Sequence, residues 1–179
     1  MDAYRAIIGK RDTRDFAERP IPQDVLHRIL QAGRMAGSAK NAQPVRLVVL
    51  EAFERRAELA ECGRFTPHLV SCAVAVAIVL APEDGEPGKP LAIFRGPFDA
   101  GRAAQNMMLA AWAEGVSSCP ASMHDAECAT RVLGLPEGYV VANVIAFGYP
   151  AEGASIGRGQ RRLPFDEYVH FERWGGKRE

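Results

Sequence analysis

The chain has 179 residues, which is the length of one ordinary domain and enough to bury a substantial core. With 47% hydrophobic and 25% charged residues, its composition is that of a folded globular protein and excludes a disordered chain. Lysine plus arginine and aspartate plus glutamate each total 22, so the formal net charge is zero. No basic excess is available to attract nucleic acid or an anionic membrane, and any anion site must therefore be local.

The cysteines and the apolar segments indicate a reduced, cytoplasmic protein. Cys62, Cys72, Cys119 and Cys128 show neither CxxC pairing nor zinc-like spacing with the histidines. Charged residues are spread through the first 15 positions, unlike a secretory signal. The longest apolar stretch, residues 72–81, is far short of the roughly 20 residues that span a bilayer. We therefore expect no metal site and no membrane contact.

Capping residues and apolar periodicity predict alternating helices and strands. The expected helices cover residues 2–9, 22–35, 51–61, 98–114 and 125–133, and the expected strands cover residues 45–50, 70–80 and 140–147, with a short extended segment at 115–120. The valine-rich strand 70–80 should be buried on both faces. Helix 98–114 is apolar nearly all round, which predicts a central position or a subunit interface. Together these elements predict a single three-layer α/β domain over residues 1–179.

A polar, turn-forming stretch from Gly37 to Pro44 separates two strongly apolar segments. Ser38, Lys40, Asn41 and Gln43 supply a hydroxyl, an ammonium and two amides within six residues. Loops held between rigid elements often carry binding residues. The alternative is a capped helix end followed by a strand, and the eight residues alone favour that alternative.

A first basic cluster follows the N-terminal helix. Arg11 and Arg14 lie three positions apart, so both guanidinium groups can reach one phosphate, and Thr13 can add a hydroxyl. The alternative is a surface ion-pair cluster with Asp12 and Asp15, which is favoured when the cluster is considered alone. A second basic cluster, Arg158, Arg161 and Arg162, could bind the same phosphate if the tail folds back, or form a solvated turn.

Recognised catalytic signatures are missing from the chain. It has no GxGxxG motif after a strand and no GxxxxGK[ST] motif. Cys119 could act as a nucleophile if a histidine approached it, but nothing in the sequence lowers its pKa, so an unreactive thiol is favoured. Polar clusters beside apolar strands, without a nucleophile, metal or acid–base pair, suggest that a bound cofactor supplies the chemistry.

Five motifs, taken in order, resemble the nitroreductase family of FMN-dependent oxidoreductases. Residues 10–16 (KRDTRDF) resemble its Arg-Arg-Ser-x-Arg-x-Phe motif, and residues 37–44 (GSAKNAQP) resemble its Pro-Ser-x-x-Asn-x-Gln-Pro loop. Asp99 with residues 105–111 (QNMMLAA) resembles its central dimer helix. The segment 115–119 (GVSSC) resembles its Gly-Leu-Gly-Ser segment, and Gly148-Tyr149-Pro150 with the late arginines completes the series.

The resemblance implies a mixed central sheet flanked by helices, in an intertwined homodimer with one FMN in each of two sites at the interface. NADPH or NADH would give hydride to the flavin. A small conjugated acceptor, such as a nitroaromatic or a quinone, would then take it in a ping-pong scheme. Because the flavin carries the chemistry, no side chain is expected to be an obligatory catalytic acid.

The resemblance also implies the cofactor-binding residues. Arg11 and Arg14 would hold the flavin phosphate and ring edge, and Arg162, with Arg161, would hold the phosphate. Cationic groups at these positions would neutralise the phosphate. The remaining expected contacts are Asp12 and Thr13 beside the flavin, Ser117 and Ser118 near the ring, where a backbone N–H could donate to the flavin N5, and Ser38, Asn41 and Gln43 from the partner subunit.

Two departures from the family pattern stand out. Asp12 occupies a position where the family usually has serine, which brings an acid close to the flavin. Val45 replaces the common tryptophan that follows the Gln-Pro pair. Two alternative functions are a flavin-binding or sequestering protein without catalysis, and a transferase or hydrolase that uses Cys119.

Overall fold

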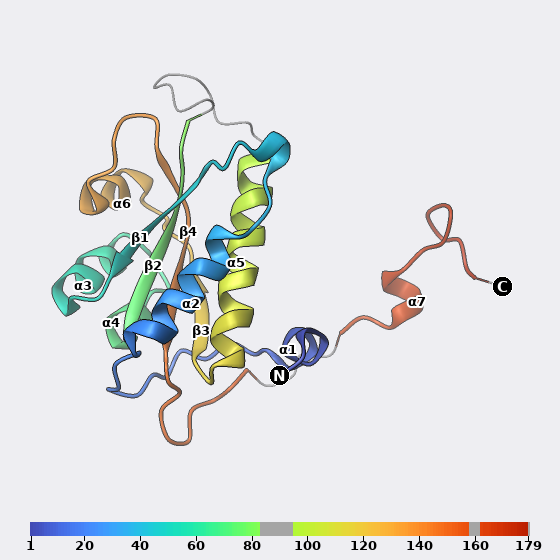
Figure 1. The fold of residues 1–179 in the computed structure, drawn as a ribbon, viewed down its shortest axis with the longest axis horizontal. Helices are drawn as coiled ribbons and strands as arrows, with labels where there is room; N and C mark the ends of the chain where they lie inside the picture. Colours follow the sequence, from blue (N-terminus) through green and yellow to red (C-terminus); the bar gives the residue numbers. More distant parts are fainter. Residues whose placement is uncertain (83–94, 158–161, 179) are drawn as a thin grey trace.

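The computed structural model describes residues 1–82, 95–157 and 162–178 (Figure 1). Its strands β1 (Val45–Leu50), β2 (Val74–Leu80), β3 (Ser117–Ala121) and β4 (Val140–Gly148) form one sheet in the order β1-β2-β4-β3. All three strand pairings are antiparallel. Helix α5 (Arg95–Ala113) crosses from the Leu80 end of β2 to the opposite end of the sheet, so β2 and β3 run in the same direction, but β4 lies between them and the expected mixed sheet is corrected. Parallel pairing among the described residues is limited to one isolated bridge, between Asp12 and Ser118.

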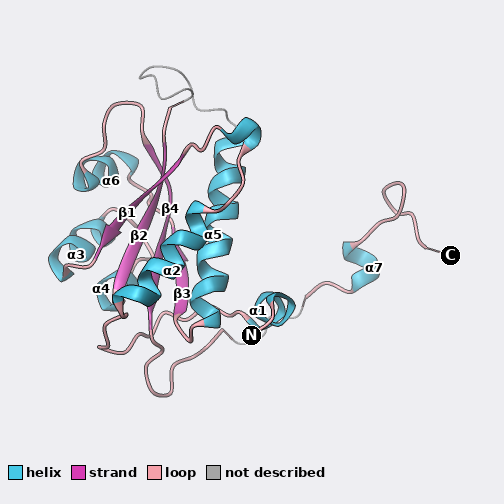
Figure 2. Cartoon of the chain, in the orientation of Figure 1, coloured by secondary structure: helices cyan, strands magenta, loops and turns pink. Residues whose placement is uncertain are grey.

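Helices cover both faces of this sheet, as the three-layer prediction requires (Figure 2). One face carries α2 and α5, and the other carries α3, α4 and α6 (Figure 1). The helices are α1 (Ala3–Gly9), α2 (Gln23–Arg34), the 3-10 turn η1 (Ala39–Asn41), α3 (Phe53–Glu61), α4 (Pro67–Ser71), α5 (Arg95–Ala113), α6 (Ala126–Leu133) and α7 (Phe165–Tyr168).

Strand β2 divides the hydrophobic core into two halves because its side chains alternate between the two faces. All seven of its residues are buried, which confirms the predicted two-sided burial. Ala75, Ala77 and Val79 pack into the core beneath α3, α4 and α6. Val76 and Ile78 pack on the opposite side, beneath α2 and α5.

Helix α5 is central, as its apolar composition predicted. Ala103, Met107 and Ala111 on one of its faces are fully buried. A Cβ built on Gly33 of α2 would lie 2.7 Å from the Cγ of Met107, so glycine at this position lets the two helices approach closely. The helix is therefore a fixed support against which the polar segments at either end of the molecule are positioned.

Capping residues set several helix boundaries where the sequence predicted them. The Asp2 side chain accepts a hydrogen bond of 2.9 Å from the backbone N–H of Arg5, and Asp125 accepts one of 2.8 Å from Cys128. Other boundaries differ by a few residues, and the largest shift is that of the predicted strand from residue 70, which begins only at Val74. Helix α4 occupies the preceding residues, with Pro67 in its first turn, where a missing N–H costs nothing.

The four cysteines are not all reduced. Cys62, at the end of α3, forms a disulfide with Cys128 in α6, so the expectation of reduced cysteines is corrected for this pair. The two positions are 66 residues apart, and the fold brings their Cα atoms to 5.5 Å. Cys72 and Cys119 are free and buried.

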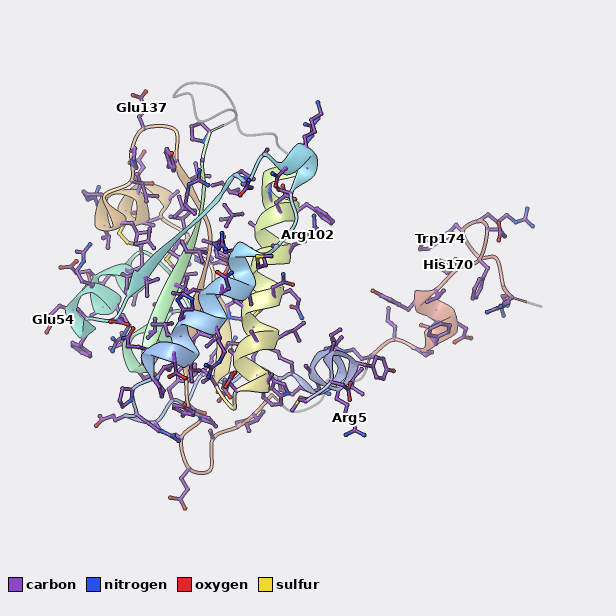
Figure 3. The ribbon with its side chains drawn as sticks, viewed as in Figure 1. Arg5, Glu54, Arg102, Glu137, His170 and Trp174 are labelled. Atoms are coloured by element: carbon purple, nitrogen blue, oxygen red, sulfur yellow. A yellow bond between two sulfur atoms is a disulfide. The ribbon has the colours of Figure 1, made fainter. Side chains whose placement is uncertain are left out.

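A C-terminal arm, residues 162–178, extends away from the sheet and its helices (Figure 1). It contains the short helix α7 and ends in a loop where the His170 and Trp174 rings lie 4.1 Å apart (Figure 3). The exposed fractions of Phe165, Tyr168 and Trp174 are 72%, 75% and 88%. Among the residues that the structure describes, no helix is both long enough and apolar enough to cross a membrane.

Candidate functional site

A basic cavity of about 770 Å³ lies where the segment after α1, helix α5, strand β3 and the start of the C-terminal arm meet. Its lining includes four cationic side chains, three from the segment after α1 and one from the C-terminal arm, namely Lys10, Arg11, Arg14 and Arg162. Asp12 and Asp15 are the two acidic residues among its described lining. The cavity therefore has an excess of positive charge and is suited to an anionic ligand.

Lys10 and Asp12 form an ion pair inside this cavity. The Lys10 side chain is only 11% exposed, and its Nζ also lies 3.5 Å from the Sδ of Met108 on α5. Asp12, which stands where the family usually has serine, therefore has a cationic partner close by. Sequence reasoning did not single out Lys10, although its place at the start of the KRDTRDF motif could have marked it.

Arg11 both closes helix α1 and lines the basic cavity. Its Nη1 donates hydrogen bonds of 2.8 Å to the carbonyl oxygens of Ile8 and Lys10. Such bonds satisfy carbonyls that lack partners at a helix C-terminus. Arg14 and Arg162, two of the residues expected to hold the phosphate, also line this cavity, whereas Arg161 lies outside the described residues.

Backbone contacts gather three chain segments around Asp12. The N–H of Thr13 donates to the carbonyl oxygen of Ser118 at 3.4 Å, and the N–H of Gly157 donates to that of Asp12 at 2.8 Å. A Cβ on Gly157 would approach the Asp12 oxygen to 3.2 Å, which is tighter than most side chains allow. These contacts hold strand β3 and the start of the arm against the segment that carries Arg11 and Arg14.

The predicted serine and threonine contacts are buried beside the cavity. Thr13, Ser117 and Ser118 are each at most 3% exposed. The Thr13 Oγ1 accepts a hydrogen bond of 3.3 Å from the Asp15 N–H. The Ser118 Oγ has no hydrogen-bond partner among the described residues. Because buried polar atoms are nearly always paired, this hydroxyl is the kind of group that a ligand satisfies.

His68 and Cys119 occupy the other side of strand β3, and neither is set up for nucleophilic catalysis. Burial lowers the pKa of His68, and the nearby Arg14 charge lowers it further. Burial also raises the pKa of Cys119, whose Sγ lies 3.6 Å from the Pro120 carbonyl oxygen. A buried thiol with a raised pKa is a poor nucleophile, so the structure argues against the cysteine-dependent alternative.

The Gly37–Pro44 loop is strained. Lys40, Asn41 and Gln43 have φ angles of 53°, 55° and 48°, in the left-handed region that costs a residue with a Cβ about 1–2 kcal/mol. Two hydrogen bonds stabilise this conformation. The Gln43 N–H donates to the Ser38 Oγ at 2.8 Å, and Arg46 donates to the Gln43 carbonyl at 2.7 Å. Backbone strain that the surroundings enforce is common at functional sites.

One chain does not bring this loop to the basic cavity. The loop lies at the N-terminal end of α5, where the Arg102 guanidinium packs against Gly37 (Figure 3). Helix α1 lies beside the C-terminal part of α5 (Figure 1). On α5, Asp99 and Ala103 line the cavity beside the loop, whereas Gln105 and Met108 line the basic cavity. Ser38 and Gln43 instead line a separate cavity of about 490 Å³ between α2, β1 and α5.

The fold and the order of its polar segments agree with a known family. The sequence matches the nitroreductase family over residues 7–70 and 71–149, and these two stretches make up most of the chain. The chain therefore belongs to the nitroreductase family.

Relatives of known name extend over nearly the whole chain. An NADH dehydrogenase of Thermus thermophilus is 28% identical over 198 residues, covering 94% of this chain and 95% of that protein. An NADPH-flavin oxidoreductase of Vibrio harveyi is 28% identical over 179 residues, covering 94% and 73% respectively. The structure of the Vibrio harveyi NADPH:FMN oxidoreductase complexed with NAD⁺ superposes with a TM-score of 0.85 at 25% identity, covering 96% of this chain and 77% of that one.

Proposed function

We propose that this protein is an FMN-dependent NAD(P)H oxidoreductase, a homodimer of one flavin-binding domain that spans residues 1–179. The observation that carries the proposal is the basic cavity, which collects Lys10, Arg11, Arg14 and Arg162 in a member of the nitroreductase family. Relatives named NADH dehydrogenase and NADPH-flavin oxidoreductase support the choice of cofactor and electron donor.

The residues of the cavity fit an FMN phosphate. A phosphate dianion needs several charged donors, and both arginines and lysines bind it well. Gly157 lets the backbone come close, and the unpartnered Ser118 Oγ offers a hydroxyl. Arg14 and Arg162 would hold the phosphate, together with Arg161. Asp12, paired with Lys10, would offset part of the positive charge and limit the attraction for other anions.

When bound, the flavin supplies hydride transfer between NAD(P)H and an acceptor. The chain binds and orients it, and Thr13, Ser117 and Ser118 provide a buried wall that excludes water from one side. Substrates would alternate at the same exposed face in a ping-pong scheme. Suitable acceptors are small and conjugated, such as nitroaromatics and quinones. No acid is needed from the protein, which agrees with the inert character of Cys119.

Three features support a homodimer. In one chain Ser38 and Gln43 line a cavity separate from the basic one, so we infer that these residues, with Asn41, meet a flavin bound by a second subunit. The aromatic side chains of the arm are exposed, and so are Tyr4, Ile7 and Ile8 of α1. Large exposed apolar side chains that cluster in this way mark surfaces covered by a partner. The zero net charge opposes association of two copies only weakly.

The test is a visible absorption spectrum of the purified protein, repeated without oxygen after addition of NADPH or NADH. The proposal predicts a yellow protein that bleaches, with the colour restored by a quinone or nitroaromatic. A yellow protein that neither nucleotide bleaches would support the flavin-sequestering alternative. A colourless protein that takes up no added FMN would contradict the proposal.

A further inference from the structure

Lys40 occupies a position where its backbone conformation gives no reason for a lysine. Its φ angle of 53° lies in the left-handed region, which glycine adopts freely and asparagine tolerates better than lysine does. The neighbouring Asn41 has an almost identical φ of 55°, and there the residue is one with a lower conformational cost. A residue with a backbone cost at an exposed turn suggests that its side chain has a role.

The loop holds the Lys40 backbone in a fixed place. The Asn41 N–H donates to the Ser38 carbonyl at 3.1 Å, and the Ala42 N–H donates to the Ala39 carbonyl at 3.0 Å. The Gln43 N–H is bonded to the Ser38 Oγ at 2.8 Å. With its backbone fixed and its side chain exposed, Lys40 presents an ammonium group from a defined point while its four-carbon stem remains free to adjust.

The other cations around this loop are already engaged within the chain. Arg34 donates from its Nε to Gln31 at 2.9 Å, Arg46 donates to the Gln43 and Val45 carbonyls, and Arg102 lies 3.7 Å from the Asp99 carboxylate. Within residues 1–82, 95–157 and 162–178, Lys40 forms neither an ion pair nor a side-chain hydrogen bond. It is therefore the cation of this group that is available to a ligand.

We propose that Lys40 binds the anionic group of the small molecule that reacts at the flavin of the partner subunit. The inference rests on the proposed dimeric flavin site, in which Ser38, Asn41 and Gln43 of this loop contact that flavin. Lys40 lies between Ser38 and Asn41 in the sequence and belongs to the same loop. The anion can be a carboxylate or sulfonate on the acceptor, or a phosphate of the nicotinamide nucleotide. Lys40 thus selects charged reactants over neutral ones of the same shape.

A pair of unreactive ligands isolates the effect of charge. Benzoate and benzamide have nearly the same size, and their dissociation constants follow from changes in the visible spectrum of the FMN-loaded dimer. We expect Lys40→Gln to weaken benzoate binding about fivefold, as for an ion pair in contact with water, and to change benzamide binding less than about twofold. Lys40→Glu should weaken benzoate further, and Lys40→Arg should restore it.

Two controls separate local charge from other effects. Arg131→Gln removes a cation from the exposed surface of α6, on the opposite face of the sheet, and should leave the benzoate-to-benzamide ratio unchanged. Salt at about 1 M, where the Debye length is about 3 Å, should reduce the preference for benzoate in the wild type. A preference that survives Lys40→Gln, or that falls equally with Arg131→Gln, would overturn the inference.

Steady-state kinetics then identify the source of the anion. In a ping-pong scheme kcat/KM for the acceptor and for the donor report separate half-reactions. A selective loss for 4-nitrobenzoate over 4-nitrobenzamide assigns Lys40 to the acceptor, and a selective loss for NADPH over NADH assigns it to the donor phosphate. If neither selective loss is observed, the inference is overturned and the proposed function still stands. A wild-type protein that takes up no FMN would overturn both.

Discussion

The basic cavity and the Gly37–Pro44 loop both lie beside α5, but they differ in how their polar groups are satisfied. In the cavity, Lys10 pairs with Asp12, and Arg11 bonds the carbonyls that end α1. Its backbone is joined to strand β3 and to Gly157. In the loop, three residues with a Cβ are held at positive φ, and Asn41 and Lys40 are exposed to solvent.

This difference indicates that the cavity binds an anion and that the loop completes a binding site. The cavity is assembled within one subunit from segments that are far apart in sequence, so it can bind an anion by itself. The loop is strained, and its residues Ser38 and Gln43 line a cavity separate from the basic one. We infer that the cavity is one half of a flavin site, and that the loop is the other half of the site in the partner subunit.

Removal of the part of the C-terminal arm that follows Arg162 should have the largest effect. The arm exposes Phe165, Tyr168 and Trp174, which we expect to be buried by a second subunit. Without it, the protein should run as a monomer and lose at least about tenfold in FMN affinity, because binding and association are coupled. Size-exclusion chromatography with light scattering and an FMN titration measure the two effects. A truncated dimer with full FMN content would show that the loop and cavity do not need the arm.

The disulfide lies outside both regions, so its removal should lower the stability of the fold without changing how the flavin site is assembled. Replacing both Cys62 and Cys128 by serine removes a link between positions 66 residues apart, which should lower the free energy of unfolding by about 2–4 kcal/mol. Urea unfolding measures this loss. FMN affinity should change less than about twofold, since α3 and α6 cover the face of the sheet away from α5. Loss of FMN from a variant that stays folded would contradict this expectation.

Arg14→Ala tests directly whether the basic cavity forms one half of the flavin site. Loss of a charge-assisted hydrogen bond costs about 1.5–3 kcal/mol, so the FMN dissociation constant should rise about 10- to 100-fold. Titration of apoprotein with FMN, followed by fluorescence, gives the constant. Arg64→Ala, which removes an exposed arginine after α3, is the matched control and should bind FMN normally. An unchanged constant for Arg14→Ala would remove this residue from the phosphate site.

Lys40→Gly tests the strain in the loop half and has the smallest expected effect. Relief of the left-handed conformation should offset the greater freedom of glycine in the unfolded chain and raise the free energy of unfolding by up to about 1 kcal/mol. Lys40→Ala is the matched variant, because it removes the same side chain but keeps the Cβ. If glycine and alanine give equal unfolding free energies in urea, the loop is not strained at this position.

Local signals in the sequence predicted much of the fold. Strand β1 has the predicted bounds, and the Asp125 cap and the Gly134 turn, at a φ of 64°, delimit α6. The polar loop and the basic clusters were likewise visible as motifs. Alternation of apolar and polar residues, capping chemistry and glycine placement act within a few residues, so they can be seen without the tertiary structure.

The features that were missed depend on long-range contacts. Cys62 and Cys128 come together only because α3 and α6 pack on the same face of the sheet, and spacing alone does not specify such a pair. Lys10 is held at the site by its contact with Met108 of α5, which is 98 positions away in the sequence. The close approach of Gly157 to Asp12 depends on the returning chain. None of these contacts leaves a local pattern.

A mixed dimer tests the central claim most directly. One subunit carries Arg14→Ala, which disables the cavity, and the other carries Asn41→Gly with Gln43→Gly, which removes both amides without adding strain at positive φ. The two subunits are co-expressed with different tags and purified through both, and FMN is measured at a concentration that fills the wild type. Both parental homodimers should be deficient in FMN.

If each site combines the cavity of one subunit with the loop of the other, the mixed dimer has one intact site and one doubly altered site. We therefore predict that it holds about one FMN per dimer, as two-fold symmetry requires. If the cavity and the loop instead acted within the same subunit, both sites would be damaged. A mixed dimer as deficient in FMN as its parents would contradict the account.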